Sequence, residues 1–185
     1  MLLTGDHNRV RGLFARFQTA HESQDQAAAE EVAETIFREL EVHTEIEETI
    51  FYPAVRELGG QAEELVVEGF EEHGVVKDLM AEVRSLAPTD EHWPAKVKVI
   101  TENVEHHAQE EETQMFPLIQ QGMDSTKLES LAKQLEAKKR ELGAPTTEAT
   151  IDLTKAELSS MAKDQQIPGR SKMSQEELAA SVAPQ

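Results

Sequence analysis

The chain contains an internal repeat built around a histidine, and this repeat restricts the fold more than any other feature. Residues 43–53 (HTEIEETIFYP) match residues 107–117 (HAQEEETQMFP) at an offset of 64 positions. The histidine, two glutamates, a threonine, an aromatic residue and the proline recur in register. A second pairing, at an offset of 66, matches Asp6–His7 with Glu72–His73. The chain therefore reads as a duplicated helical hairpin, in which each half supplies one isolated histidine and one His-x-x-x-Glu motif.

Apolar residues recur at steps of three and four along most of the first 142 residues, which is the pattern of amphipathic helices. Pro53 disturbs the second predicted helix, and Gly59 ends it. Because the connections are short and strand-like alternation is almost absent, we expect an all-α fold: an antiparallel up-down four-helix bundle with an additional C-terminal helix and a small helical tail. The predicted helices run from about residue 6 to 22, 25 to 58, 61 to 86, 94 to 122 and 125 to 142.

The composition of the chain changes after residue 142. Residues 143–150 are poor in apolar side chains and rich in turn formers, so we expect a linker there. The linker joins a bundle over residues 1–142 to a tail over residues 151–185. Two capping-box motifs in the tail predict two short helices joined by an extended segment. Such a short unit buries little apolar surface by itself.

Each His-x-x-x-Glu motif places its two side chains on one helix face, because residues four apart lie about one turn apart. Pairing the two halves about a pseudo-twofold axis brings both motifs and both isolated histidines together inside the bundle. Burying so many ionisable groups is costly unless metal ions or ion pairs compensate them. The chain has no cysteine, and imidazole with carboxylate suits iron, manganese or zinc, with positions left for an oxo or hydroxo bridge and an exogenous molecule. The predicted metal ligands are His7, His43, Glu47, His73, His107 and Glu111.

A purely structural interpretation of the same residues competes with the metal site. A single pair such as His43 and Glu47 on an exposed helix is usually a solvated hydrogen-bonding pair. His7 or His73 taken alone is more often a surface histidine or a satisfied core histidine. Duplication could also preserve the pattern in a bundle whose site no longer works. We rank that interpretation last, because both halves keep every predicted ligand.

Residues beside the motifs are assigned to the surroundings of the site. Glu48 and Glu112 lie one step off the ligand face, where they either hydrogen-bond to the ligating histidines or face solvent. His106 lies about 100° round the helix from His107, so we place it in the outer layer or on the surface.

The aromatic and apolar neighbours of the motifs form a second group. Phe51 and Met115 continue the ligand stripe by another four residues and predict an apolar lid beneath the site. Tyr52 is the only tyrosine. An ideal helix turns it away from Glu47, but Pro53 can distort that turn, so Tyr52 is a candidate phenol in the outer layer.

The charge balance argues against several partners. The chain has 18 Lys and Arg against 36 Asp and Glu, and its formal charge of −18 repels nucleic acid and anionic membrane surfaces. No stretch approaches the ~20 apolar residues of a membrane span, and the N-terminus lacks the apolar run of a signal peptide. We therefore expect a cytoplasmic protein without a membrane partner.

The motifs over residues 1 to about 122 resemble the HHE cation-binding domain of the hemerythrin-like family. The match includes the Glu-Glu and aromatic-Pro context of both His-x-x-x-Glu segments. The resemblance implies a four-helix bundle with a non-haem di-iron centre, with iron preferred over manganese or zinc. It also implies that Glu47 and Glu111 bridge the metals and that the four histidines are terminal ligands.

The same resemblance separates this chain from the oxygen-carrying hemerythrins. Lys77 stands where the carrier has a second histidine on its third helix, and Glu111 replaces an aspartate that follows the carrier's histidine by five residues. The chain is thus similar to the bacterial hemerythrin-like subgroup, which implies binding of or reaction with peroxide, dioxygen or nitric oxide in oxidative or nitrosative stress defence. Catalase-like decomposition of peroxide is the favoured activity. The Glu-x-x-His of ferritin-type ferroxidases and the His-Glu-x-x-His of zincins are absent.

The tail carries a second, weaker resemblance. Residues 153–158 and 167–178 are similar to the helix-extended-helix module of Rho-terminator N-terminal-like and SAP-like segments, which often contact nucleic acid. The tail holds four basic and five acidic residues, which favours docking to a protein over contact with DNA. The alternative to an enzyme is therefore a noncatalytic iron, oxygen or redox sensor, or a metal-binding protein, that acts through residues 151–185.

Overall fold

The computed structural model describes residues 2–144, 159, 162–163, 167 and 169–173. Within these residues the regular structure is helical and contains no strand, so the predicted all-α class is confirmed. The predicted linker beyond residue 144 and most of the predicted tail lie outside the described residues. The helices are α1 (Leu2–Glu22), α2 (Gln26–Ile46), η1 (Glu47–Phe51), α3 (Tyr52–Arg56), α4 (Gln61–Ser85), α5 (His92–Glu110), η2 (Glu111–Met115), α6 (Phe116–Gly122), α7 (Ser125–Glu141) and the short η3 (Arg170–Lys172).

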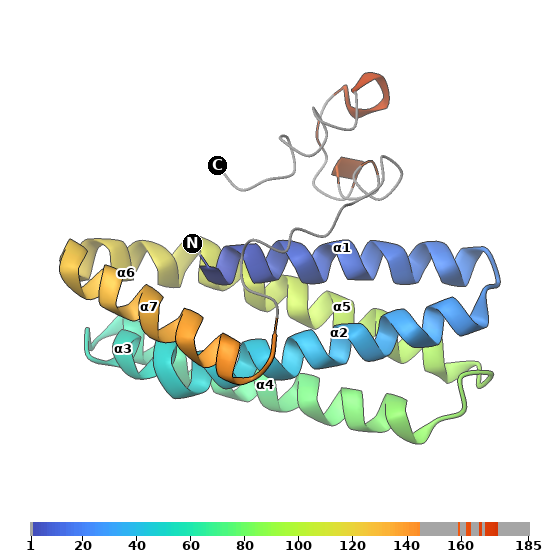
Figure 1. The fold of residues 1–185 in the computed structure, drawn as a ribbon, viewed down its shortest axis with the longest axis horizontal. Coiled ribbons are helices and arrows are strands. Elements are labelled where there is room, and N and C mark those ends of the chain that lie inside the picture. The colour runs from blue at the N-terminus through green and yellow to red at the C-terminus, as the bar shows by residue number, and fades with distance from the viewer. Residues whose placement is uncertain (1, 145–158, 160–161, 164–166, 168, 174–185) are drawn as a thin grey trace.

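Four long antiparallel rods form the bundle (Figure 1). Two of them are the single helices α1 and α4, and the other two are composite: α2 continues through η1 into α3, and α5 continues through η2 into α6. The main packing is α1 against α2 and α4 against α5, as a duplicated hairpin requires. The additional C-terminal helix α7 folds back over the bundle and contacts α1, α2 and η1.

Side-chain caps and glycines set the helix ends. Asp25 accepts a hydrogen bond from the Ala28 amide at 3.1 Å at the start of α2, and Asp124 accepts one from the Lys127 amide at 2.9 Å at the start of α7. Two glycines with positive φ, at positions 59 and 60, separate α3 from α4. The helix α1 begins at Leu2, which is earlier than the predicted start near residue 6.

Both ligand-bearing rods widen at the same point of the repeat. The turns η1 and η2 are π-helical: the Tyr52 amide bonds to the Glu47 carbonyl and the Phe116 amide bonds to the Glu111 carbonyl, each five residues back. The next residue in both cases is a proline, which has no N–H to continue an α-helical ladder. The prediction of one helix over residues 25–58 is therefore wrong in detail, because the rod consists of three segments and ends at Arg56.

Two apolar clusters lie along the bundle, and the histidines fall between them on every rod. One cluster includes Phe17, Ile36, Trp93 and Ile100. The other includes Phe51 and Met115, which are buried as predicted for an apolar lid, together with the residues of α7 that face the bundle. Among the described residues, no helix is both long enough and apolar enough to cross a membrane.

The first cluster should carry stability independently of the site. Replacing the fully buried Ile100 with alanine should lower the free energy of unfolding by about 2–5 kcal/mol, because it leaves a cavity in a packed core. The adjacent Val99 is 41% exposed, so Val99→Ala should change the free energy of unfolding by less than about 0.5 kcal/mol. Chemical denaturation of both variants measures the difference, and equal losses would contradict this assignment of the core.

Candidate metal centre

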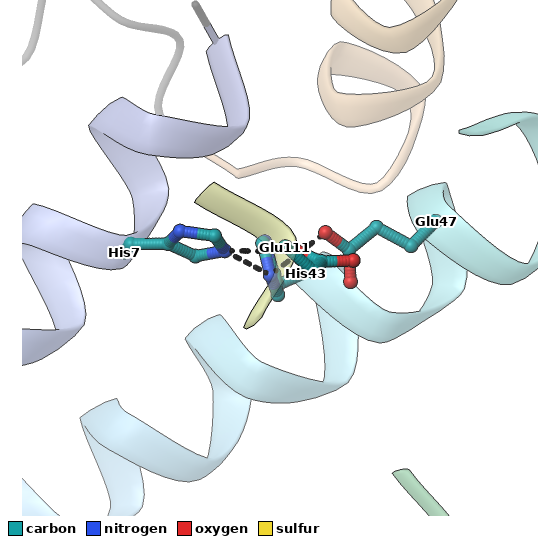
Figure 2. A group of neighbouring side chains, drawn as sticks. All are labelled: His7, His43, Glu47 and Glu111. Atoms are coloured by element: carbon teal, nitrogen blue, oxygen red, sulfur yellow. Dashed lines mark hydrogen bonds and ion pairs between the residues drawn. The ribbon is translucent and has the colours of Figure 1, made fainter. Parts of the chain in front are cut away.

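The structure brings all six predicted ligands together in the middle of the bundle. Their nitrogen and oxygen atoms form two groups within which all candidate atoms lie within 4.8 Å of one another. All six side chains are buried, Glu47 and Glu111 almost completely. The first group, drawn in Figure 2, is His7, His43, Glu47 and Glu111, and the second is Glu47, His73 and His107.

Imidazole Nε2 atoms meet in pairs, one pair in each half of the repeat. His7 Nε2 lies 3.2 Å from His43 Nε2, and His73 Nε2 lies 3.1 Å from His107 Nε2. We call the first pair with its neighbouring carboxylate oxygens the first half-site, and the second pair with its carboxylate oxygens the second half-site. Two nitrogen lone pairs facing each other at such distances are a natural arrangement for a shared cation.

Each of the two buried glutamates divides its oxygens between the half-sites. Glu47 places Oε1 at 3.0 Å from His43 Nε2 and Oε2 at 3.3 Å from His73 Nε2. Glu111 places Oε2 at 3.3 Å from His7 Nε2 and Oε1 at 3.7 Å from His107 Nε2. Both carboxylates therefore have the orientation that would bridge two ions.

The donor set fits metal ions, because the protein leaves these carboxylates unsatisfied. None of the four oxygens of Glu47 and Glu111 has a hydrogen-bond partner of good geometry, although all are buried. Such orphaned charge is costly in a protein interior. Two divalent or trivalent cations would compensate it, and four imidazoles with two carboxylates are a ligand set suited to iron, manganese or zinc.

A second layer of carboxylates fixes the outer nitrogen of three of the four imidazoles. His7 Nδ1 donates to Glu112 at 2.8 Å, and His73 Nδ1 donates to Glu48 at 2.9 Å. Of the two roles predicted for Glu48 and Glu112, these contacts confirm hydrogen bonding to the histidines rather than exposure to solvent alone. Such partners fix the tautomer and raise the basicity of the inner nitrogen. Every partner comes from a different helix than its histidine, which ties helix packing to the site.

Two members of this layer escaped the sequence reasoning. Glu72 Oε2 accepts from His107 Nδ1 at 2.7 Å, and Asp6 Oδ2 lies 3.7 Å from His43 Nδ1. Both acids immediately precede a histidine of the repeat, at positions 6 and 72. Their recurrence in register was a usable signal. His106, by contrast, has a side chain that is 65% exposed and is 3.8 Å from Glu72, in agreement with its predicted surface position.

The electrostatics of the metal-free site favour protonated imidazoles. Burial alone would lower the pKa of His43, but the carboxylates of Glu47 and Asp6 outweigh it and raise that pKa well above the ordinary value of 6.5. The pKa values of His7 and His107 are also raised above 6.5, because the carboxylates beside each of them outweigh the effect of burial. The pKa of Glu47 is held well below 4.5, because the neighbouring His43 and His73 overcome its burial. In the metal-free protein the buried carboxylates thus favour the protonated form of His7, His43 and His107.

Tyr52 points its hydroxyl group at the second half-site. Tyr52 Oη lies 3.2 Å from His73 Nε2 and 3.4 Å from His107 Nε2, which is hydrogen-bonding distance from both nitrogens. Burial and the charges of Glu47 and Glu111 raise its pKa far above the ordinary value, which keeps the phenol protonated. The π-helical η1 explains its position, because five residues complete the wide turn and Tyr52 returns to the face of Glu47.

The space for this hydroxyl depends on a glycine. A Cβ atom at Gly69, one turn before His73, would lie 2.6 Å from Tyr52 Oη. The repeat places Leu3 and Phe116 at the corresponding positions of the other half, both buried in an apolar cluster. One half therefore combines a glycine with a phenol, and the other combines a leucine with a phenyl ring.

The protonation of the site predicts opposite pH dependence with and without metal. Histidines whose pKa is raised on folding stabilise the metal-free protein fully below 6.5, and the stabilisation is lost as the pH rises through the raised values. The stabilisation from Glu47 is present above 4.5 and is lost only when the pH falls through its lowered pKa. Metal ions compete with these protons, so metal affinity should fall as the pH falls.

Denaturation across a pH series, with metal-free and metal-loaded protein, measures both trends. The free energy of unfolding of the metal-free protein should decrease above pH 6.5. His43→Gln should weaken this slope, whereas the exposed control His92→Gln should leave it unchanged. Metal-free protein that gains stability over the same range would contradict the assignment.

The contact between Gly69 and Tyr52 predicts a coupling between two substitutions. Gly69→Ala should destabilise the protein by about 1–3 kcal/mol, because the new methyl group overlaps the phenol. Tyr52→Phe in the same chain should recover part of that loss. The matched control is Gly74→Ala on the same helix, where a Cβ meets nothing within 4 Å and a gain in helix propensity is expected. Additive effects in denaturation experiments would show that Gly69 does not make room for Tyr52.

Comparison with known proteins agrees with the geometry. The family model described as "Hemerythrin HHE cation binding domain" matches residues 2–119. A protein named "DNA nickase" from Nostoc sp. (strain PCC 7120) is 28% identical over 150 residues, which cover 79% of this chain and 41% of that protein. The chain thus spans about two fifths of the length of this relative, and no solved structure matches significantly. The chain belongs to the hemerythrin HHE cation-binding domain family.

Proposed function

We propose that the protein holds two non-haem iron ions between its half-sites and that it binds or reacts with peroxide, dioxygen or nitric oxide. Catalase-like decomposition of peroxide is the favoured reaction. The observation that carries the proposal is the sharing of two buried, unsatisfied carboxylates, Glu47 and Glu111, by two pairs of histidines. The histidines would be terminal ligands and the glutamates bridges. When bound, two irons would supply redox equivalents and open coordination positions.

A small cavity beside the histidines supports a small reactant. Its volume is about 20 Å³. A cavity of this size holds about one molecule as small as water, peroxide or a diatomic gas. Apart from the four histidines and Thr44, its lining is apolar. A cavity of this size and lining suits a small, uncharged reactant better than a bulky organic substrate. The apolar lining residues are Val10, Leu40, Val76, Val104 and Ala108.

Two residues favour reaction over reversible oxygen transport. Lys77, which stands where the carrier has a histidine, pairs instead with Glu48 at 2.6 Å, on the carboxylate oxygen that also accepts from His73 Nδ1. Its side chain is 44% exposed. Tyr52 offers a protonated phenol beside the second half-site, and a phenol in this position can donate a proton to a reactant that is being reduced.

Metal content and turnover test the proposal together. Protein purified without added metal or affinity tag, then loaded anaerobically with ferrous iron, should contain about two irons per chain by mass spectrometry. The loaded protein should consume peroxide with release of dioxygen. His43→Ala and Glu111→Ala should lose both iron and turnover, because each removes a donor from the buried set.

His92→Ala serves as the control, since this histidine is exposed and outside both half-sites. Substoichiometric iron after anaerobic loading would defeat the proposal, as would unchanged iron content in the His43 or Glu111 variant. Iron at the expected level without peroxide turnover would remove the catalase-like reaction and direct the assay to nitric oxide and dioxygen.

A noncatalytic sensor is the second candidate function. The observation in its favour is the contact of α7 with the rods that carry the first half-site, since α7 is the last bundle helix before the predicted linker in the sequence. In a sensor, occupancy of the site would change how residues 151–185 meet a partner. Deleting residues 144–185 separates the two functions: an enzyme keeps its turnover, whereas a sensor loses its response to the partner.

We do not extend the nicking activity in the name of the Nostoc relative to this chain. The proposed metal site is buried inside the bundle, whereas a nicking site has to be open to a DNA phosphodiester. The formal charge of −18 further opposes binding of a polyanion. The unmatched three fifths of that relative can hold activities that this chain lacks.

A further inference from the structure

Helix α7 sends a fully buried lysine into the outer layer of the first half-site. The side chain of Lys139 is 2% exposed, and its Nζ donates to Asp6 Oδ1. These two residues are 133 positions apart, and α7 lies beyond the region matched by the family model. A buried ammonium group is costly unless it is paired, so its pairing with Asp6 fixes where α7 rests on the bundle.

The lysine competes with a histidine for the same carboxylate. Asp6 Oδ1 accepts from Lys139 Nζ, while Asp6 Oδ2 lies 3.7 Å from His43 Nδ1. Neither Oδ2 nor that Nδ1 atom has a hydrogen-bond partner in the described structure. The three other histidines of the centre donate from Nδ1 to their carboxylates at 2.7–2.9 Å.

The corresponding position in the other half of the repeat has a different environment. There Glu72 accepts from His107 Nδ1 at 2.7 Å and is 23% exposed to solvent. The imidazole of His106 is 65% exposed, and its Nε2 lies 3.8 Å from Glu72 Oε1. Within the described residues, no buried lysine or arginine pairs with Glu72. The repeat is therefore symmetric in its ligands and asymmetric in the charge behind them.

We propose that Lys139 is a positioning residue that makes the two half-sites unequal. By holding Asp6 away from His43, it leaves His43 Nδ1 without the hydrogen bond that fixes the ring orientation of the other three imidazoles. The first half-site then binds its metal more weakly, and the two ions load in order, the second half-site first. This inference rests on the proposed binding of two irons.

Anaerobic ferrous titration of the full-length protein tests the inference. The native protein should bind iron in two resolved steps, and one equivalent should give a single environment in its Mössbauer spectrum. Lys139→Met frees Asp6 to accept from His43, so the weaker step should tighten by about 10–100-fold and one equivalent should distribute over both half-sites. The matched control Lys138→Met removes a neighbouring lysine that pairs with Glu45 and Glu141. It should leave both steps unchanged.

A double variant covers the case in which Lys139→Met does not fold. Asp6→Asn with Lys139→Met removes both charges, and the two resolved steps should persist, since no carboxylate is left behind His43. A purely structural role for Lys139 would instead weaken iron binding in the single variant.

Two titration results distinguish the failure of this inference from the failure of the proposed function. Native protein that binds two irons in equivalent steps overturns the inference alone. Native protein that does not bind two irons overturns the proposed function.

Discussion

The burial of two carboxylates is the constraint on which the rest of this structure depends. Glu47 and Glu111 are removed from water, and none of their four oxygens has a hydrogen-bond partner of good geometry. A protein interior tolerates such groups only when positive charge lies beside them. The carboxylates raise the pKa of His7, His43 and His107, which favours positive charge beside them in the metal-free protein, and metal ions would supply it in the loaded protein. The site is thus an electrostatic necessity of the fold as well as a candidate for chemistry.

The outer carboxylates transmit this requirement to the helix packing. Glu48 and Glu112 reach from the π-helical turns to histidines on α4 and α1, so a shift of any one rod would break a contact in the centre. Each such contact also directs a histidine Nε2 inward, because the outer nitrogen is already donating. The apolar clusters on either side keep water from replacing these contacts. Ligand geometry and bundle geometry are therefore determined together.

The repeat explains why the ligands could be predicted from sequence, and why several neighbours could not. A spacing of four residues fixes which side chains share a helix face, and duplication identifies the partner helices. The position of Tyr52 depends on a π-helical turn, whose register follows from the proline and from tertiary packing rather than from local periodicity. Asp6 and Glu72 recur in register, yet acids beside a histidine in so acidic a chain carry little weight alone. Lys139 lies outside the repeat and meets Asp6 only after folding.

The differences between the two halves carry more functional information than their likeness. Duplication supplies two equal half-sites at once, but a reaction that delivers a reactant to one ion benefits from inequality. The two pairs of histidines have different aromatic neighbours. Tyr52, with Gly69 beside it, adjoins the second half-site. At the first half-site, the ring of Phe116 lies 6.0 Å from the ring of His7. A phenol on one side and a phenyl ring on the other give the half-sites different proton supplies. The ligand set alone would specify a metal pair, and the unequal surroundings would give each member of that pair a different environment.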